Sequence, residues 1–125
     1  MATVDVTKDN FTQTINNNDM VVVDFWAPWC GPCKSFGPVY EEISEKHDDV
    51  VFAKVNTEAE QELATHFQIR SIPTLMILKE QVVVFSQPGA VPGSALEEII
   101  DKAKALDMDK VRAEIAAEES TPSQA

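Results

Sequence analysis

Residues 23–34 read VDFWAPWCGPCK, and this stretch contains Cys30 and Cys33, the only two cysteines of the chain. An apolar run precedes the pair, and the apolar spacing of a helix follows it. Two cysteines three positions apart at the start of a helix are close enough to form and reopen a disulfide. Because so short a loop restrains little of the unfolded chain, we interpret the pair as chemical rather than structural.

Length and composition are typical of one compact domain. The chain has 125 residues, of which 44% are hydrophobic, enough to bury a core without a metal or further disulfides. The formal net charge of -11 argues against the basic surface that a nucleic-acid-binding protein needs. We therefore expect no nucleic-acid partner, and a monomer is the default expectation.

The apolar segments indicate neither export nor a membrane anchor. Residues 1–5, MATVD, lack the basic and apolar regions of a secretory signal. The apolar run 20–26 is interrupted by Asp24 and is far shorter than the ~20 residues that a membrane helix needs. We expect a cytoplasmic protein, and in a reducing cytosol a lone Cys-x-x-Cys is more often catalytic or metal-binding than a permanent bridge.

Periodicity predicts alternating strands and helices followed by a hairpin. The predicted strands span 3–6, 20–26, 50–55, 75–79 and 81–86. The last two strands have almost no connection, so they must pair antiparallel. Four helices lie between or after the strands, and their predicted caps are Thr7, the pair Thr57 and Glu60, the pair Ser94 and Glu97, and the Pro32 turn. This order predicts an α/β fold with three layers, α/β/α, and a central mixed five-stranded sheet flanked by four helices.

The C-terminal part of the chain forms an extension to this domain. We assign residues 1–106 to the domain and residues 107–125 to the extension. Met108, Val111 and Ile115 align on one helical face, so a short helix is predicted over 107–119, with a disordered tail after it.

The order of the two cysteines suggests distinct roles. A thiolate rather than a thiol attacks a disulfide, and unpaired amides and the helix dipole favour negative charge on Cys30. We expect Cys30 to be exposed, and Cys33, one turn further, to face inward and resolve the mixed disulfide. Gly31 keeps bulk away from the attacking sulfur, and Pro32 limits the freedom of the loop.

An acidic residue interrupts the apolar strand before the cysteines. Burial of Asp24 should raise its pKa, and Lys54 in the neighbouring predicted strand is its candidate partner. The acid could accept the Cys33 proton, through water, as that thiol attacks. Alternatively, Asp24 is a satisfied polar residue that fixes the strand register.

Cys-x-x-Cys is also half of many zinc sites, which need two further ligands. His47 and His66 are the only histidines, and both are expected near helix ends that point away from the cysteines. We therefore expect no metal site.

The stretch 23–34 together with Arg-Ser-Ile-Pro-Thr at 70–74 strongly resembles thioredoxin, and the likeness covers roughly residues 3–106. The resemblance implies the thioredoxin fold, with Cys30 as nucleophile and Cys33 as resolving thiol. It also implies Asp24 as buried proton acceptor with Lys54 as its companion, and Pro73 as a cis-proline that sets backbone beside the cysteines. From the residues alone, Pro73 could instead be an ordinary proline at a strand start.

The resemblance also implies an apolar docking surface for an extended substrate segment. The matching residues are Trp29, Gly31, Ile72, Pro73, Pro88 and Gly89, with Trp26 as a packing residue. The chain departs from the family at Gln68 and Gln81, where thioredoxins usually carry Gly, and at Pro88, which has no amide to donate. The resemblance says nothing about the extension.

The resemblance implies a thiol-disulfide oxidoreductase that reduces disulfides in other proteins through Cys30 and Cys33. The four glycines form no Gly-x-Gly-x-x-Gly loop, so we expect no bound cofactor and a separate thioredoxin reductase as electron donor. One alternative is an oxidant or isomerase on the same fold, although Gly31-Pro32 favours reduction. Another is a non-enzymatic subunit whose docking surface binds a partner, aided by the extension.

Overall fold

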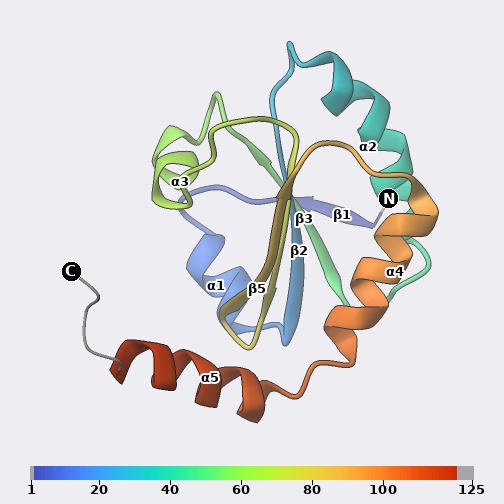
Figure 1. Ribbon diagram of the computed structural model, residues 1–125. Helices are drawn as coiled ribbons and strands as arrows, with labels where there is room; N and C mark the ends of the chain where they lie inside the picture. The colour runs from blue at the N-terminus through green and yellow to red at the C-terminus, as the bar shows by residue number, and fades with distance from the viewer. Residues whose placement is uncertain (1, 121–125) are drawn as a thin grey trace.

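The computed structural model describes residues 2–120 and contains a five-stranded mixed sheet between two layers of helices (Figure 1). The strands are β1 (Thr3–Asp5), β2 (Met20–Trp26), β3 (Val51–Asn56), β4 (Thr74–Lys79) and β5 (Val82–Pro88). The helices are α1 (Phe11–Asn16), α2 (Gly31–Ser44), α3 (Gln61–His66), α4 (Gly93–Lys104) and α5 (Met108–Ser120). The strand order is β1-β3-β2-β4-β5, with β1, β3 and β2 parallel and with β4 antiparallel to both β2 and β5. The predicted fold class is confirmed.

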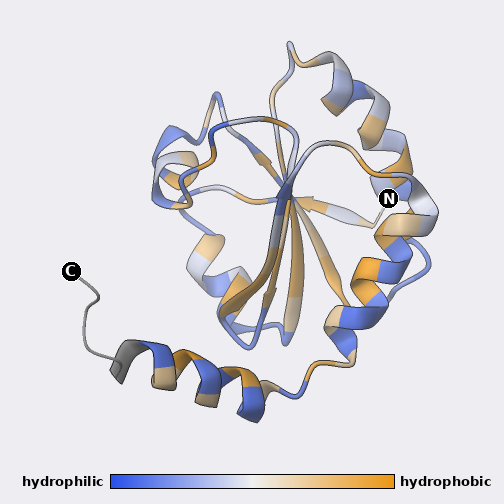
Figure 2. Ribbon diagram, in the orientation of Figure 1, coloured by the Kyte–Doolittle hydropathy of each residue, from blue (hydrophilic) through white to orange (hydrophobic). Residues whose placement is uncertain are grey.

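The central strand β2 is apolar throughout because helices cover both faces of the sheet. Met20 and Val22 pack into the core under α2 and α4, whereas Val21, Val23 and Phe25 pack into the core under α1 and α3. Figure 1 shows α2 and α4 on one side of the sheet and α1 and α3 on the other, and Figure 2 shows the hydrophobic strands between them. By this alternation, Asp24 belongs to the face that α2 covers.

Strand register brings two loops together at one end of the sheet. Trp26, at the end of β2, pairs with Asn56 of β3, and Phe25 pairs with Thr74 at the start of antiparallel β4. The loop that leaves β2 therefore lies beside the loop that enters β4. The first carries the cysteines, and the second carries the Ile72-Pro73 peptide bond, which is cis.

The predicted cap of α1 is wrong. The helix begins at Phe11, with Asn10 as its N-cap, and the carbonyl of Thr7 accepts from the amides of Asn10 and Phe11. Thr7 therefore belongs to the turn before the helix.

The predicted capping boxes are also wrong, because the N-caps of α3 and α4 are Glu60 and Pro92. The Thr57 hydroxyl donates to the carbonyl of Trp26 at 3.0 Å. The Glu60 carboxylate accepts from the amide of Lys8 at 2.7 Å. Helix α4 begins at Gly93 with Pro92 as its N-cap, so Ser94 lies inside the first turn without capping it.

Helix α5 continues the chain after a short break from α4. Met108 is buried at its start, and the Arg112 guanidinium bonds to Glu80 at 2.7 Å and to Asp109 at 2.8 Å. Of the predicted disordered tail, residues 121–125 lie outside the described residues. Among residues 2–120, no helix is both long and apolar enough to span a lipid bilayer.

Two glutamines occupy backbone conformations that favour glycine. Gln68 has φ 55° and follows α3, where its amide bonds to the Thr65 carbonyl and the next amide bonds to the Ala64 carbonyl. This is the Schellman arrangement that usually ends on glycine. Gln81 has φ 69° in the two-residue turn between β4 and β5. Both positions are those at which the chain departs from the glycines of the family it resembles.

Gln68→Gly is therefore expected to raise the free energy of unfolding by about 0.5–1 kcal/mol, because a Cβ in the left-handed region costs more than the extra backbone entropy of glycine. Urea unfolding with an unchanged m-value measures the gain. Gln13→Gly, inside α1, is the matched control and should destabilise by about the same amount. Equal losses in both variants would contradict the prediction.

Candidate active site

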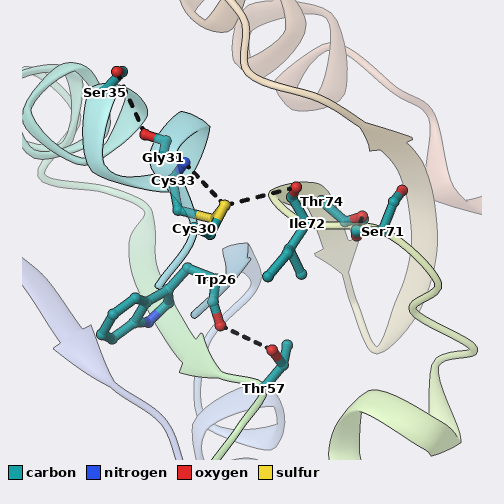
Figure 3. The surroundings of a disulfide bond; sticks show 9 residues. All are labelled: Trp26, Cys30, Gly31, Cys33, Ser35, Thr57, Ser71, Ile72 and Thr74. Carbon is teal, nitrogen blue, oxygen red and sulfur yellow. Dashed lines mark hydrogen bonds between the residues drawn. A yellow bond between two sulfur atoms is a disulfide. The ribbon is translucent and has the colours of Figure 1, made fainter. Parts of the chain in front are cut away.

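Helix α2 starts at the disulfide between Cys30 and Cys33, whose Cα atoms are 5.2 Å apart. Cys30 is the N-cap, and its Sγ accepts from the Cys33 amide at 3.2 Å (Figure 3). Pro32 fits the first turn because its missing N–H has no partner to lose there. The sulfur of Cys30 therefore sits where the unpaired amides of a helix point.

The two cysteines are equally buried. Each is only 5% exposed, because Ala27, Trp26 and Ile72 pack around them. The expectation of an exposed Cys30 is wrong for this disulfide form. The neighbours Gly31 and Pro32 are exposed, and Trp29 is 69% exposed.

The β4 loop lies directly against the disulfide. The Sγ of Cys30 is 3.8 Å from the Ile72 carbonyl oxygen (Figure 3). Pro73 is buried and Ile72 is half-buried, whereas Pro88 and Gly89 are exposed. The Gly89 amide donates to the Pro73 carbonyl at 2.8 Å, which ties the end of β5 to this loop. The residues expected to dock a substrate thus come from three segments that meet beside the disulfide.

Asp24 is a buried acid without a hydrogen-bond partner. It is 1% exposed, and within the described residues neither carboxyl oxygen has a partner. Lys54 stands opposite it in the register of β2 and β3. The Lys54 Nζ lies 4.9 Å from the centroid of the Trp26 ring, so this charge also contacts an aromatic face.

Burial raises the pKa of Asp24 to about 7, and the positive charge of Lys54 opposes this rise. Near neutral pH the carboxyl therefore exists in both protonation states. A group in that condition can take up or release a proton in the physiological range.

A surface hollow runs past Cys33 to the Lys54 side chain. Its wall is formed by Trp26, Cys33, Lys34, Gly37, Pro38, Glu41 and Lys54. Cys33 and Lys54, the register partner of Asp24, therefore line the same hollow.

Sequence reasoning placed Tyr40 on the apolar face of its helix and overlooked its hydroxyl. The residue is fully buried, and the hydroxyl donates to the Val22 carbonyl at 2.9 Å and to the Ala53 carbonyl at 2.7 Å. The signal was available, because a buried tyrosine usually needs a hydrogen-bond partner.

The histidines lie in separate surroundings. The His47 Nδ1 is 2.8 Å from the Lys104 Nζ, and His66 packs edge-on against Phe67. Among the described residues, no group of three or more His, Cys, Asp or Glu side chains is arranged to hold a metal ion.

The chain is similar in sequence and in structure to known thioredoxins. The Thioredoxin family model matches residues 2–102. Thioredoxin 2 of Streptomyces coelicolor is 57% identical over 119 residues, which cover 95% of this chain and 89% of that protein. The thioredoxin of Porphyra purpurea is 45% identical over 104 residues, covering 82% of this chain and 97% of that protein. The solution structure of oxidised Plasmodium falciparum thioredoxin has a TM-score of 0.74 at 38% identity, covering 82% of this chain and 99% of that one.

The family model, over residues 2–102, spans all five strands and helices of both layers. The Streptomyces match covers 119 of the 125 residues, so it includes part of the extension 107–125. The disulfide at the start of α2 joins the two cysteines of the Cys-Gly-Pro-Cys motif. The chain belongs to the thioredoxin family and is a thiol-disulfide oxidoreductase of the protein-disulfide reductase class, acting through the Cys30–Cys33 pair.

Proposed function

We propose that Cys30 is the nucleophile that opens disulfides in client proteins and that Cys33 resolves the mixed disulfide. The observation that carries this assignment is the Cys33 amide, which points at the Cys30 sulfur at 3.2 Å. In the reduced protein the same amide and the helix dipole favour a thiolate on Cys30. Gly31 and Pro32 keep the loop short and open to the incoming disulfide.

The exchange proceeds in two balanced steps. The Cys30 thiolate forms a bond to one client sulfur, the client S–S bond breaks, and the other client sulfur leaves and takes a proton. The Cys33 thiol then loses its proton and attacks the Cys30 sulfur, which breaks the mixed disulfide and releases the second client sulfur as a thiolate that takes up a proton. Two electrons and two protons pass to the client, and the Cys30–Cys33 disulfide remains.

Asp24 is the proposed acceptor of the Cys33 proton, through water in the hollow beside Lys54. A pKa of about 7 for Asp24 supports this role, because a general base works best when its pKa lies near the operating pH. Lys54 is the proposed companion, whose positive charge limits the rise of the Asp24 pKa. Burial without a hydrogen-bond partner argues against the alternative of a satisfied register-fixing residue.

The proposed substrate surface consists of Trp29, Gly31, Ile72, Pro73, Pro88 and Gly89. The large exposed Trp29 supports this assignment, because exposed aromatic rings commonly anchor partners. A client segment in extended conformation would lie across the loop that carries Ile72 and Pro73.

The proposed electron donor is a separate thioredoxin reductase, and the proposed setting is the cytoplasm, with the protein acting as a monomer without a bound cofactor. The pair Gly31-Pro32 between the cysteines favours reduction over oxidation or isomerisation. Equilibration with glutathione or dithiothreitol, followed by tryptophan fluorescence, tests the direction. A potential more negative than the glutathione couple supports the reductase, whereas a more positive one places the protein among oxidants or isomerases.

Asp24→Asn is expected to slow the resolving step about 100-fold near pH 7, the lower end of the usual contribution of a general base. Stopped-flow mixing of the reduced protein with a large excess of client disulfide makes the first attack fast, and release of the second client thiol then measures this step. The natural protein should show an inflection near pH 7 that the variant lacks, since the pKa of Asp24 lies at about 7. Coincident pH profiles would assign Asp24 a structural role only.

A further inference from the structure

Tyr40, the only tyrosine of the chain, lies on α2 seven residues after Cys33, which places the two side chains two turns apart on one helix face. It is 0% exposed. Its ring contacts the rings of Phe36 and Phe52, with centroids 5.7 and 5.4 Å away. Packing therefore fixes the ring, and the hydroxyl lies against the sheet.

The Tyr40 hydroxyl bonds to both central strands at once. Its acceptors are the carbonyls of Val22 in β2, at 2.9 Å, and of Ala53 in β3, at 2.7 Å. A hydroxyl has one hydrogen, so the two carbonyls share it or alternate as acceptors. In either case α2 is tied to the junction of these two strands.

Strands β2 and β3 also carry the proposed proton acceptor, Asp24, and its companion, Lys54, close after these two carbonyls. Asp24 follows Val22 by two residues and so shares its face, while Lys54 follows Ala53 directly and stands opposite Asp24. Burial raises the pKa of Tyr40 well above its usual value, and the negative charge of Asp24 raises it further. The hydroxyl therefore lies within electrostatic reach of the carboxyl.

We infer that Tyr40 is a positioning residue for the exchange: its hydroxyl fixes α2, and with it Cys33, at a set separation from Asp24. This inference rests on the proposed role of Asp24. The Phe36 and Phe52 rings hold the Tyr40 ring in place, and the Tyr40 hydrogen bonds add a defined distance and angle to the backbone of β2 and β3. The separation between Cys33 and Asp24 matters because proton transfer requires hydrogen-bond reach, directly or through one water.

The charged and titratable groups around Asp24 are few. Lys54 faces it from β3, and Cys33, Tyr40 and Glu41 lie on α2, while β4 contributes the apolar Leu75 as its register partner. Tyr40→Phe changes only one of them and keeps the ring and its contacts.

In the test, Tyr40→Phe is compared with the natural protein in two rate measurements. The resolving step at pH 7 is expected to fall about three- to tenfold, the equivalent of one lost hydrogen bond, while the first attack by Cys30 stays unchanged. The pH inflection of the resolving step should stay near pH 7, because burial and Lys54 set the pKa of Asp24 and the Tyr40 hydroxyl bonds to the Val22 and Ala53 carbonyls instead.

Ile43→Val is the matched control, because it loosens the same buried face of α2 without touching the hydroxyl. It should reduce stability to a similar extent and leave both rates and the inflection unchanged. A Tyr40→Phe protein that behaves like this control overturns the inference.

The double variant with Asp24→Asn separates this inference from the proposed role of Asp24. If Tyr40 acts through Asp24, then Tyr40→Phe adds no further slowing in the Asp24→Asn background. Equal slowing in both backgrounds overturns the inference but leaves the Asp24 role intact. An Asp24→Asn protein that resolves at the natural rate overturns both.

Discussion

Cys30→Ser is expected to abolish disulfide reduction, whereas Cys33→Ser should give a protein that reacts once and remains joined to its client. The reason is the position of Cys30 at the N-cap, where its sulfur accepts a hydrogen bond from the Cys33 amide. The Cys33 sulfur accepts no equivalent hydrogen bond within the described residues. Without Cys30 no thiolate starts the exchange. Without Cys33 nothing internal attacks the mixed disulfide, so the complex accumulates.

Turnover with a disulfide-bonded client and non-reducing electrophoresis measure the two outcomes. The reduced natural protein is the proper reference for stability, since neither variant can form the disulfide. Mixed disulfides trapped to the same extent by both single variants would refute the assignment of distinct roles. Partner function that survives in the Cys30→Ser, Cys33→Ser double variant would instead favour a binding subunit.

The order of strands and helices could be predicted because each element carries its own periodicity. The apolar run at 20–26 has the same bounds as β2. A strand that is buried on both faces is apolar along its whole length, so the ends of the apolar run mark the ends of the strand. The redox role of the cysteine pair could be predicted for a similar reason, because the disulfide joins residues that are close in sequence.

The Pro32 turn of α2 could be predicted, but the caps of α1, α3 and α4 could not, because cap side chains can have competing partners distant in sequence. Thr57 and Glu60 match the pattern of a capping box, yet they bond to Trp26 and Lys8, which lie 31 and 52 positions away. The role of the Tyr40 hydroxyl was hidden in the same way, since its acceptors belong to strands that meet only in the folded sheet. The equal burial of the cysteines depends on Ile72, from a third segment.

Asp24→Asn is expected to stabilise the oxidised protein at alkaline pH by about 4 kcal/mol more than it does at pH 4. The pKa of Asp24 is raised from 3.8 to about 7 in the folded protein. The folded state therefore binds the proton more tightly than the unfolded state. Stability supplied by this group is complete below the unfolded pKa, falls as pH rises toward 7, and is lost above it.

The difference in unfolding free energy between the two proteins isolates this effect. Other titrating groups are common to both, and in the oxidised form the disulfide cysteines do not titrate. Urea unfolding at pH 4, 5.5, 7 and 8.5 should show the difference growing by about 1.4 kcal/mol per pH unit up to neutrality, and then levelling off. Leu75→Val is the control, because Leu75 is the register partner of Asp24 in β4 and carries no ionisable group, so its difference should not grow with pH.

A difference that does not change with pH would mean that the Asp24 carboxyl is hydrated or paired in solution, and its case as a proton acceptor would lose its physical basis. The predicted growth would mean the opposite: the fold gives up several kcal/mol at neutral pH to keep an ionisable acid buried in the central strand β2. An apolar or amide residue in that place would make a more stable sheet. Such growth would therefore support the proposed role of Asp24 as acceptor of the Cys33 proton.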